Sequence, residues 1–294
     1  MKLVSSETAC KALDLQIERL NSSMIERVRR TALAESAVDP AAIFGAGKRL
    51  RARLALRTGA AVGMPDAAVA VAAAVEMVHA ASLLHDDVID GGELRRGAPA
   101  FWVAHGVQGA ILVGDLVLCS AYEVIRELDE PSVLHALMDH TREMCEAEIE
   151  QELIRRGRAA DWAAAERAAR RKTGALFAFA AFGAAGAAGP LADALREAGY
   201  LAGTAYQLSD DVLDQVGDPA AAGKTLGRDA ARGKNTAATI NGGDPGPALC
   251  RIPALREQAE RRLADWPEAL DAFREYWALD LQPALDANTR PARK

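Results

Sequence analysis

The chain has 294 residues, of which 50% are hydrophobic and only 5% aromatic, and it carries a net charge of −6. This length allows one large core or two modest domains, and the acidic charge argues against a general nucleic-acid binder. Abundant alanine, with no alternating apolar–polar runs and no repeats, favours packed helices over strands. We therefore expect an all-α protein, with one domain or two.

The sequence gives no sign of secretion or of a membrane span. The N-terminus, MKLVSSETAC, lacks the apolar core of a signal peptide. Residues 174–192 are uncharged, but they are mostly alanine and glycine and include Pro190, which favours a buried packing helix. The cysteines form no CxxC pair and indicate reduced thiols rather than a disulfide framework or a zinc site: Cys10, Cys119, Cys145 and Cys250. We expect a soluble, cytoplasmic protein.

Two segments open the chain. Residues 7–35 have helical apolar spacing and predict a structural helix, with a stripe of Leu13, Ile17, Leu20, Met24 and Val28. Residues 42–56 then read AIFGAGKRLRARLAL. Lys48 and Arg51 are three positions apart in this segment and share a helix face. Taken alone, the segment fits a basic surface turn as well as it fits a pair of anion-binding residues.

The next predicted element is a long apolar helix from residue 66 to residue 90, with Asp66 as its N-cap. Its C-terminal end carries three aspartates: Asp86, Asp87 and Asp90. Asp86 and Asp90 are one turn apart, with roughly 6 Å between them. Carboxylates there repel each other and oppose the negative end of the helix dipole. A hard cation such as Mg²⁺ would remove both penalties.

Basic residues follow this motif at once. Gly91-Gly92 is expected to end the helix. Arg95 and Arg96 then supply two guanidinium groups of the kind that bind phosphate. Acidic groups for a metal ion and basic groups for phosphate lie a few residues apart, which indicates a diphosphate site.

The middle of the chain predicts helices at residues 107–128 and 132–157. The second of these carries glutamates that we expect to be mostly solvated: Glu146, Glu148, Glu150 and Glu152. Lys172-Thr173 stands at the edge of the strongly apolar run that follows, which weakens its interpretation as an ordinary basic surface spot.

A second aspartate motif follows Pro190, which is well placed to open its helix. Residues 206–214 read YQLSDDVLD and repeat the pattern L-x-D-D-V-x-D of the first motif, with Asp210, Asp211 and Asp214. A single DDxxD is most often a solvated helix face, but two copies in unfavourable places indicate a site. Gln207 lies one turn before Asp211. The long glycine-bearing loop 217–236 is of a kind that is usually functional.

Together these segments resemble the trans-isoprenyl diphosphate synthases, also called polyprenyl synthetases, over roughly residues 40–240. The resemblance implies the isoprenoid synthase fold, in which residues 1–294 form a single-domain helical bundle around a central cavity, with the two aspartate motifs facing each other near its mouth. It also implies a homodimer and three Mg²⁺ ions per active site, held by Asp86, Asp90, Asp210 and Asp214.

The resemblance further implies roles for the basic and polar residues. Isopentenyl diphosphate would be bound by Lys48, Arg51, His79 and Arg96, although a lone histidine on an apolar face is more often a core residue. The allylic diphosphate would be held by Arg95, Lys172, Lys224 and Lys234. Thr173 and Gln207 would lie near the reacting carbons.

The chain departs from the family pattern in places. Ala52 replaces the usual proline of the GKRLRP segment, and Thr236-Ala237-Ala238 stands where the family has Thr-Leu-Pro. After about residue 240 the helical part looks shortened, with helices expected only around residues 247–266 and 267–287. This change bears on the cover of the site and on the acceptor.

The expected function is Mg²⁺-dependent condensation of an allylic diphosphate with isopentenyl diphosphate. Two alternatives stay open: a class I terpene cyclase or a prenyltransferase with another acceptor, and a non-catalytic partner subunit. By resemblance, Ala81 and Ser82 can form a floor for the growing chain. Because both are small, the expected product is C20 or longer, with a deeper floor at Leu118 or Tyr122.

Overall fold

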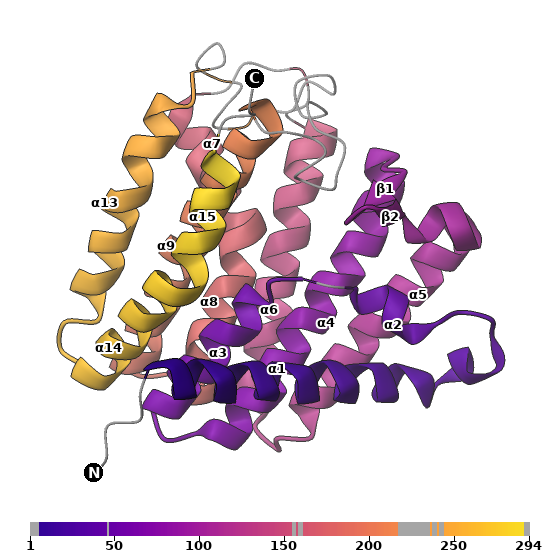
Figure 1. Ribbon diagram of the computed structural model, residues 1–294, viewed down its shortest axis with the longest axis horizontal. Coiled ribbons are helices and arrows are strands. Elements are labelled where there is room, and N and C mark those ends of the chain that lie inside the picture. Colours follow the sequence, from indigo (N-terminus) through magenta and orange to yellow (C-terminus); the bar gives the residue numbers. More distant parts are fainter. Residues whose placement is uncertain are drawn as a thin grey trace.

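The structure is a computed structural model that describes residues 6–45, 47–154, 157, 161–216, 236, 240 and 244–290. The first half contains α1 Ser6–Arg29, η1 Ala32–Glu35, α2 Pro40–Phe44, α3 Leu50–Ala61, α4 Pro65–Asp90, β1 Leu94–Arg95, β2 Ala98–Pro99 and α5 Phe101–Arg126. The second half contains α6 Pro131–Ile149, η2 Glu150–Ile154, α7 Trp162–Ala169, η3 Arg170–Gly174, α8 Ala175–Phe182, η4 Gly183–Ala185, α9 Pro190–Val216, α13 Gly246–Arg262, α14 Pro267–Tyr276, η5 Trp277–Leu281 and α15 Gln282–Thr289. The expected all-α fold is confirmed (Figure 1).

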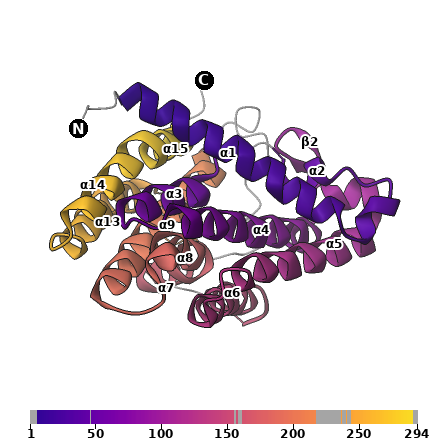
Figure 2. The same cartoon turned by 90° about the horizontal axis from the view of Figure 1, so that it is seen from below.

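Helix α1 crosses the bundle instead of joining it. It lies along one face, next to α3 and α4 (Figures 1 and 2). The predicted stripe faces the protein, since its five residues are all buried: Leu13, Ile17, Leu20, Met24 and Val28. The polar residues between them face solvent, so the helix covers the bundle as expected.

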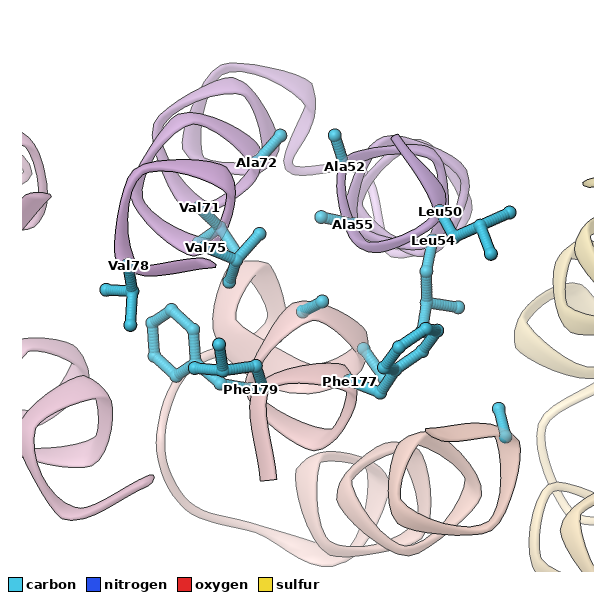
Figure 3. Close-up of a cluster of buried hydrophobic side chains, with 14 of the residues drawn as sticks. Leu50, Ala52, Leu54, Ala55, Val71, Ala72, Val75, Val78, Phe177 and Phe179 are labelled. Carbon is cyan, nitrogen blue, oxygen red and sulfur yellow. The ribbon is translucent and has the colours of Figure 1, made fainter. Parts of the chain in front are cut away.

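The centre of the core lies between α3, α4 and α8. Figure 3 shows Leu54 of α3, Val71 and Val75 of α4, and Phe177 and Phe179 of α8 turned toward one another. Both phenylalanines are 0% exposed. The buried apolar residues of the described chain form one connected cluster that reaches from α1 to α15. Burial of this kind is the main favourable contribution to folding.

Glycines bring α9, which carries the second aspartate motif, into close contact with η3 and α8, the segment that begins with Lys172 and its neighbours. A Cβ atom on Gly203 of α9 would lie 2.6 Å from the Cα of Gly174, at the end of η3. A Cβ atom on Gly199 would lie 2.5 Å from the carbonyl oxygen of Phe177. Since real side chains do not approach so closely, only glycine allows this spacing. The backbones themselves thus fix the second aspartate motif relative to Lys172.

The last helices are tied to α3 by a buried carboxylate. Asp280 of η5 accepts hydrogen bonds from Arg57 Nε at 2.6 Å and from Arg53 Nη1 at 3.2 Å. The Asp280 side chain is only 5% exposed. Beside it, Tyr276 and Trp277 are almost fully buried. The C-terminal helices therefore complete the core next to the helix that begins with the GKRLR segment.

The structure corrects three details of the sequence-based expectations. Helix α4 begins at Pro65, so Asp66 lies in its first turn and is not the N-cap. A short hairpin pairs Leu94 with Pro99, where no strand was expected. The apolar run 174–192 is not one helix, because α8 ends at Phe182. Two glycines with positive φ separate it from α9, at +89° for Gly186 and +110° for Gly189.

Two of the described helices, α4 and α5, are long and apolar enough to cross a membrane by length and composition. The apolar window of α4 is 67% buried inside the protein, as in a core helix, whereas that of α5 is only 22% buried.

Candidate active site

One cavity of about 740 Å³ collects the residues that the sequence singled out. The following predicted site residues line it: Lys48, Arg51, His79, Asp86, Asp90, Arg95, Arg96, Lys172, Thr173, Gln207, Asp210 and Asp214. They come from segments that are far apart in the chain, and the fold brings them together. The two remaining residues, Lys224 and Lys234, lie outside the described residues.

The aspartates of each motif divide into two kinds. The outer residues, Asp86 and Asp90 on α4 and Asp210 and Asp214 on α9, are partly exposed in the cavity. The middle residues, Asp87 and Asp211, are each only 5% exposed. Because the outer carboxylates are the more exposed ones in the cavity, they are the candidates for a metal ion.

The outer carboxylates fit Mg²⁺ that is shared with a ligand. They offer only hard oxygen donors, the type that Mg²⁺ prefers. Within the described part of the chain, no three carboxylate, histidine or cysteine side chains converge on one point. Mg²⁺ is commonly held by one or two carboxylates together with phosphate and water, and not by a cage made of protein alone. This donor set therefore suits ions that bridge the protein to a diphosphate.

Asp87 holds Arg95 at the edge of the cavity. Both of its oxygens accept from Arg95 Nε, at 3.1 and 3.2 Å, and one also accepts from Nη2. Burial opposes the charge of Arg95, but the hydrogen bonds and charge of Asp87, with Asp86 and Asp210 nearby, raise its pKa above the ordinary value. Arg95 thus stays charged and is oriented next to the first motif.

Arg96 lies against Gly45, at the end of α2, and against Gly47, the first residue of the GKRLR segment. Its Nη1 donates to the carbonyl oxygen of Phe44 at 2.9 Å. A Cβ atom would lie 2.7 Å from Nη1 if placed on Gly45, and 2.9 Å from Nη2 if placed on Gly47. Arg96 itself has φ +54°, a left-handed conformation that non-glycine residues adopt rarely. The two segments predicted to bind diphosphate therefore form one surface around this guanidinium group.

A buried ion pair that the sequence did not reveal supports the same surface. Arg49 and Glu76 have side chains that are 5% and 3% exposed, and Arg49 Nη1 lies 3.2 Å from a Glu76 oxygen. Glu76 also accepts from the backbone N–H of Ala52 at 3.2 Å, in the first turn of α3. Arg49 has φ +52°, which turns it inward between Lys48 and Leu50. Glu76 thereby caps α3 from outside.

Arg51 and His79 lie deeper in the cavity wall. The Arg51 guanidinium lies 4.8 Å from the centre of the Phe177 ring, a cation–π contact. Within the described residues, its buried Nε has no hydrogen-bond partner. Burial, followed by the charges of Arg51 and Arg96, lowers the pKa of His79 well below its ordinary value. His79 is therefore neutral near pH 7 and can act there only as a neutral hydrogen-bonding group.

Lys172 and Thr173 lie in η3, a π-helical turn between α7 and α8. Such turns occur often at functional sites. Lys172 forms an ion pair with Glu148, whose side chain is only 18% exposed. Burial lowers the Lys172 pKa, but Glu148 and Asp86 outweigh it and raise the pKa above the ordinary value. The expectation of mostly solvated glutamates was wrong for Glu148, and also for Glu150, which lies 2.6 Å from Arg171.

Thr173, Gln207 and Asp211 form a hydrogen-bonded chain across α9 and η3. Thr173 Oγ1 donates to Gln207 Oε1. Gln207 Nε2 in turn donates to Asp211 Oδ1 at 2.8 Å. Thr173 and Asp211 are buried, while Thr173 and Gln207 both line the cavity. The two residues expected near the reacting carbons are thus in direct contact.

The cavity also has lining residues that the sequence did not indicate. Asn288 of α15 lines it and donates to Ser209 Oγ at 3.2 Å. Gln151 of η2 lines it beside Lys172. No local pattern distinguishes these residues from ordinary polar residues. Their place at the site depends on how α6 and α15 pack.

The wall below the first motif is made of small and medium-sized side chains. Ala81 and Ser82 of α4 line the cavity, together with Leu118, Thr141 and Met144 of α5 and α6. Tyr122 is not among the described residues that line it.

Comparisons of the sequence and of the structure with known proteins agree with one another. Residues 38–251 match the family model described as "Polyprenyl synthetase". The octaprenyl diphosphate synthase of Haemophilus influenzae is 30% identical over 285 residues, covering 95% of this chain and 86% of that protein. The short chain isoprenyl diphosphate synthase of Methanothermobacter thermautotrophicus is 34% identical over 296 residues, covering 94% and 86%.

Among solved structures, a polyprenyl synthase from Caulobacter crescentus, complexed with calcium and isoprenyl diphosphate, superposes with a TM-score of 0.82. It is 27% identical, and the match covers 99% of this chain and 100% of that one. The two relatives are named for products of different length, so similarity alone does not assign the product length of this chain.

Proposed function

The chain belongs to the polyprenyl synthetase family and is a prenyltransferase, and from this premise we propose that it condenses an allylic diphosphate with isopentenyl diphosphate. The proposed products are pyrophosphate and a trans-polyprenyl diphosphate of C20 or longer. One observation carries the proposal. A single cavity holds four outer carboxylates and, beside them, two basic groups of residues, enough for two diphosphates.

We assign the allylic diphosphate to the side of the cavity next to the aspartate motifs. Asp86, Asp90, Asp210 and Asp214 would hold Mg²⁺, by family resemblance three ions. When bound, Mg²⁺ neutralises the leaving diphosphate as a Lewis acid. Arg95 is charged and lies close to both motifs, and Lys172 is charged and lies close to the first. Both would bind and orient the same diphosphate. Lys224 and Lys234 are proposed to join them.

We assign isopentenyl diphosphate to the surface formed by Lys48, Arg51, His79 and Arg96. Three of these are cations, and neutral His79 can add a hydrogen bond without competing for charge. The double bond of the acceptor would attack the allylic carbon as pyrophosphate leaves. Departing pyrophosphate is proposed to take the proton that is lost, since none of the described side chains suggests itself as a general base.

The test of this function is a product assay. Purified protein would be incubated with Mg²⁺ and allylic diphosphates of different lengths, with and without isopentenyl diphosphate, and the products identified by mass. The proposal requires elongated diphosphates only when isopentenyl diphosphate is present. Cyclic hydrocarbons formed from the allylic substrate alone would indicate a terpene cyclase. No turnover without an added partner protein would indicate a non-catalytic subunit.

If the cavity holds two separate diphosphate sites, a substitution in each site should raise KM for a different substrate. Arg96→Ala should raise KM for isopentenyl diphosphate, and Lys172→Ala should raise KM for the allylic substrate. Each loses a charged hydrogen bond of roughly 1.5–3 kcal/mol, so the expected change is about ten- to a hundredfold. Initial rates with one substrate varied at a time measure it. The same KM changing most in both variants would contradict the division.

Product length should depend on Ser82. Its side chain lines the cavity one turn before Asp86, and its hydroxyl donates to the His79 carbonyl at 3.0 Å. Ser82→Phe should shorten the product, because a large side chain fills the cavity below the reacting carbons and leaves the metal ligands unchanged. Chromatography of the dephosphorylated products measures the length. A wild type that stops at C15, or an unchanged length in the variant, would place the floor elsewhere.

The family resemblance also suggests a single-domain cytoplasmic protein that forms a homodimer, and one surface supports the dimer. Exposed apolar side chains recur along α5 on both sides of the kink at Gly106, with exposures of 48% for Val103, 41% for Val107, 42% for Ile111 and 68% for Leu112. Several exposed apolar side chains on one element are typical of protein–protein interfaces. We propose that this surface meets the same surface of a second copy, as in most homodimers.

A further inference from the structure

The hydrogen-bonded chain from Thr173 to Asp211 has a direction that chemistry alone fixes. A carboxylate can only accept hydrogen bonds, so the group of Gln207 that faces Asp211 must be its NH₂. The carbonyl oxygen of the same amide then faces Thr173 and can only accept. Thr173 must therefore donate its single hydroxyl proton to Gln207.

This direction determines what Thr173 offers to the cavity. A buried threonine in a helix usually donates to a carbonyl of the preceding turn, or it can rotate to suit a ligand. Here the proton is already used. The hydroxyl of Thr173, which lines the cavity, can present only oxygen lone pairs to a bound molecule. Such a group stabilises a positive charge and cannot donate a hydrogen bond to an anion.

We infer that Asp211 is a positioning residue that orients the Gln207 amide and, through it, holds the Thr173 hydroxyl with its oxygen toward the reacting carbons. The inference rests on the proposed function, in which positive charge develops on the allylic carbons. It assigns different roles to Asp210 and Asp211, the neighbouring aspartates of the second motif. Both residues line the cavity, but Asp210 is partly exposed there as a candidate metal ligand, whereas Asp211 is only 5% exposed and acts through two polar side chains.

The burial of the middle aspartate supports this division. Asp211 is 5% exposed, and Asp87, its counterpart in the first motif, is equally buried and binds Arg95. In both motifs the middle carboxylate thus orients a cavity residue. Among the described residues, it is the second motif in which the oriented residue passes the effect on to a hydroxyl group.

The test exchanges the carboxylate of Asp211 and the amide of Gln207. Asp211→Asn removes the fixed acceptor, so the Gln207 amide can turn over and Thr173 can donate into the cavity. Gln207→Glu places a carboxylate against Asp211. The double variant restores the direction, because the glutamate accepts from Thr173 and from the new asparagine NH₂. It also keeps the net charge of the wild type.

We expect each single variant to lower kcat by about ten- to a hundredfold, the value of a hydrogen bond to a charged group, with KM for both substrates almost unchanged. The double variant should recover to within about threefold of wild type, as coupled neighbours do. Asp211→Asn should have no further effect in a Thr173→Val background. The matched control, Asp210→Asn, should instead raise the Mg²⁺ concentration needed for half-maximal rate.

A double variant no better than the worse single variant would overturn the inference, and so would a normal kcat in Asp211→Asn. The same set is also measured by urea denaturation without substrates. There, too, the double variant should recover the stability that each single variant loses. A wild type without condensing activity would refute the proposed function. The denaturation series would still decide the direction of the hydrogen bonds between Thr173, Gln207 and Asp211.

Discussion

Replacing Asp86 or Asp210 by alanine should lower turnover by about a thousandfold, since each variant loses a ligand of the ion that stabilises the leaving group, a contribution of several kcal/mol. Both side chains line the cavity at the ends of α4 and α9. Neither is part of the apolar core, so the fold should persist. Steady-state rates at saturating Mg²⁺, with circular dichroism of each variant, measure the effect.

The control for this prediction lies on the same helix. Asp66, in the first turn of α4, is exposed and far along the helix from the cavity. Asp66→Ala should keep normal turnover and lose at most a few tenths of a kcal/mol of stability from its interaction with the helix dipole. If Asp86→Ala or Asp210→Ala retained near wild-type turnover with an intact fold, these carboxylates would not be metal ligands.

The largest effect on stability is expected from Glu76→Ala. The substitution leaves the Arg49 guanidinium buried without its carboxylate, and it removes the acceptor for the Ala52 N–H. Breaking a buried pair in this way costs about 3–5 kcal/mol. The free energy of unfolding from denaturant titration measures the loss. KM for isopentenyl diphosphate should rise as well, because Arg49 donates a hydrogen bond to the carbonyl oxygen of Gly45, against which Arg96 lies.

A surface pair provides the comparison. Glu26 and Arg30 are in contact at 2.9 Å, with side chains that are 46% and 76% exposed. Glu26→Ala should change the free energy of unfolding by less than about 1 kcal/mol, as is usual for exposed pairs. Losses of equal size in Glu26→Ala and Glu76→Ala would show that burial of the Arg49–Glu76 pair does not matter.

The parts of the site that the sequence predicted are those written in local patterns. The aspartates, Arg95, Arg96 and the Lys172-Thr173 pair all stand in short segments whose charge is hard to explain on an isolated helix. The fold places the described ones around one cavity. The apolar stripe of α1 was predictable for the same reason, since helical spacing alone specifies a buried face.

The parts that the sequence missed depend on contacts between distant segments. Arg49 stands between Lys48 and Leu50 and looks like one more cation of that loop. Its inward direction comes from a left-handed backbone and from Glu76, which lies 27 positions later. Glu148 looks like its solvated neighbours until α6 packs against η3 and brings it to Lys172. Neither pairing leaves a trace in the spacing of the residues.

The contact between α3 and Asp280 has a consequence for the stage of synthesis at which the binding segment can fold. Arg53 and Arg57 share the buried acceptor Asp280 in η5, and Tyr276 and Trp277 fill the core beside it. Asp280 is synthesised 223 positions after Arg57. The segment with Lys48 and Arg51, although made early, therefore has no finished support during most of synthesis. A nascent chain stalled before residue 267 should not bind isopentenyl diphosphate, whereas a chain that contains η5 and α15 and has been released from the ribosome should.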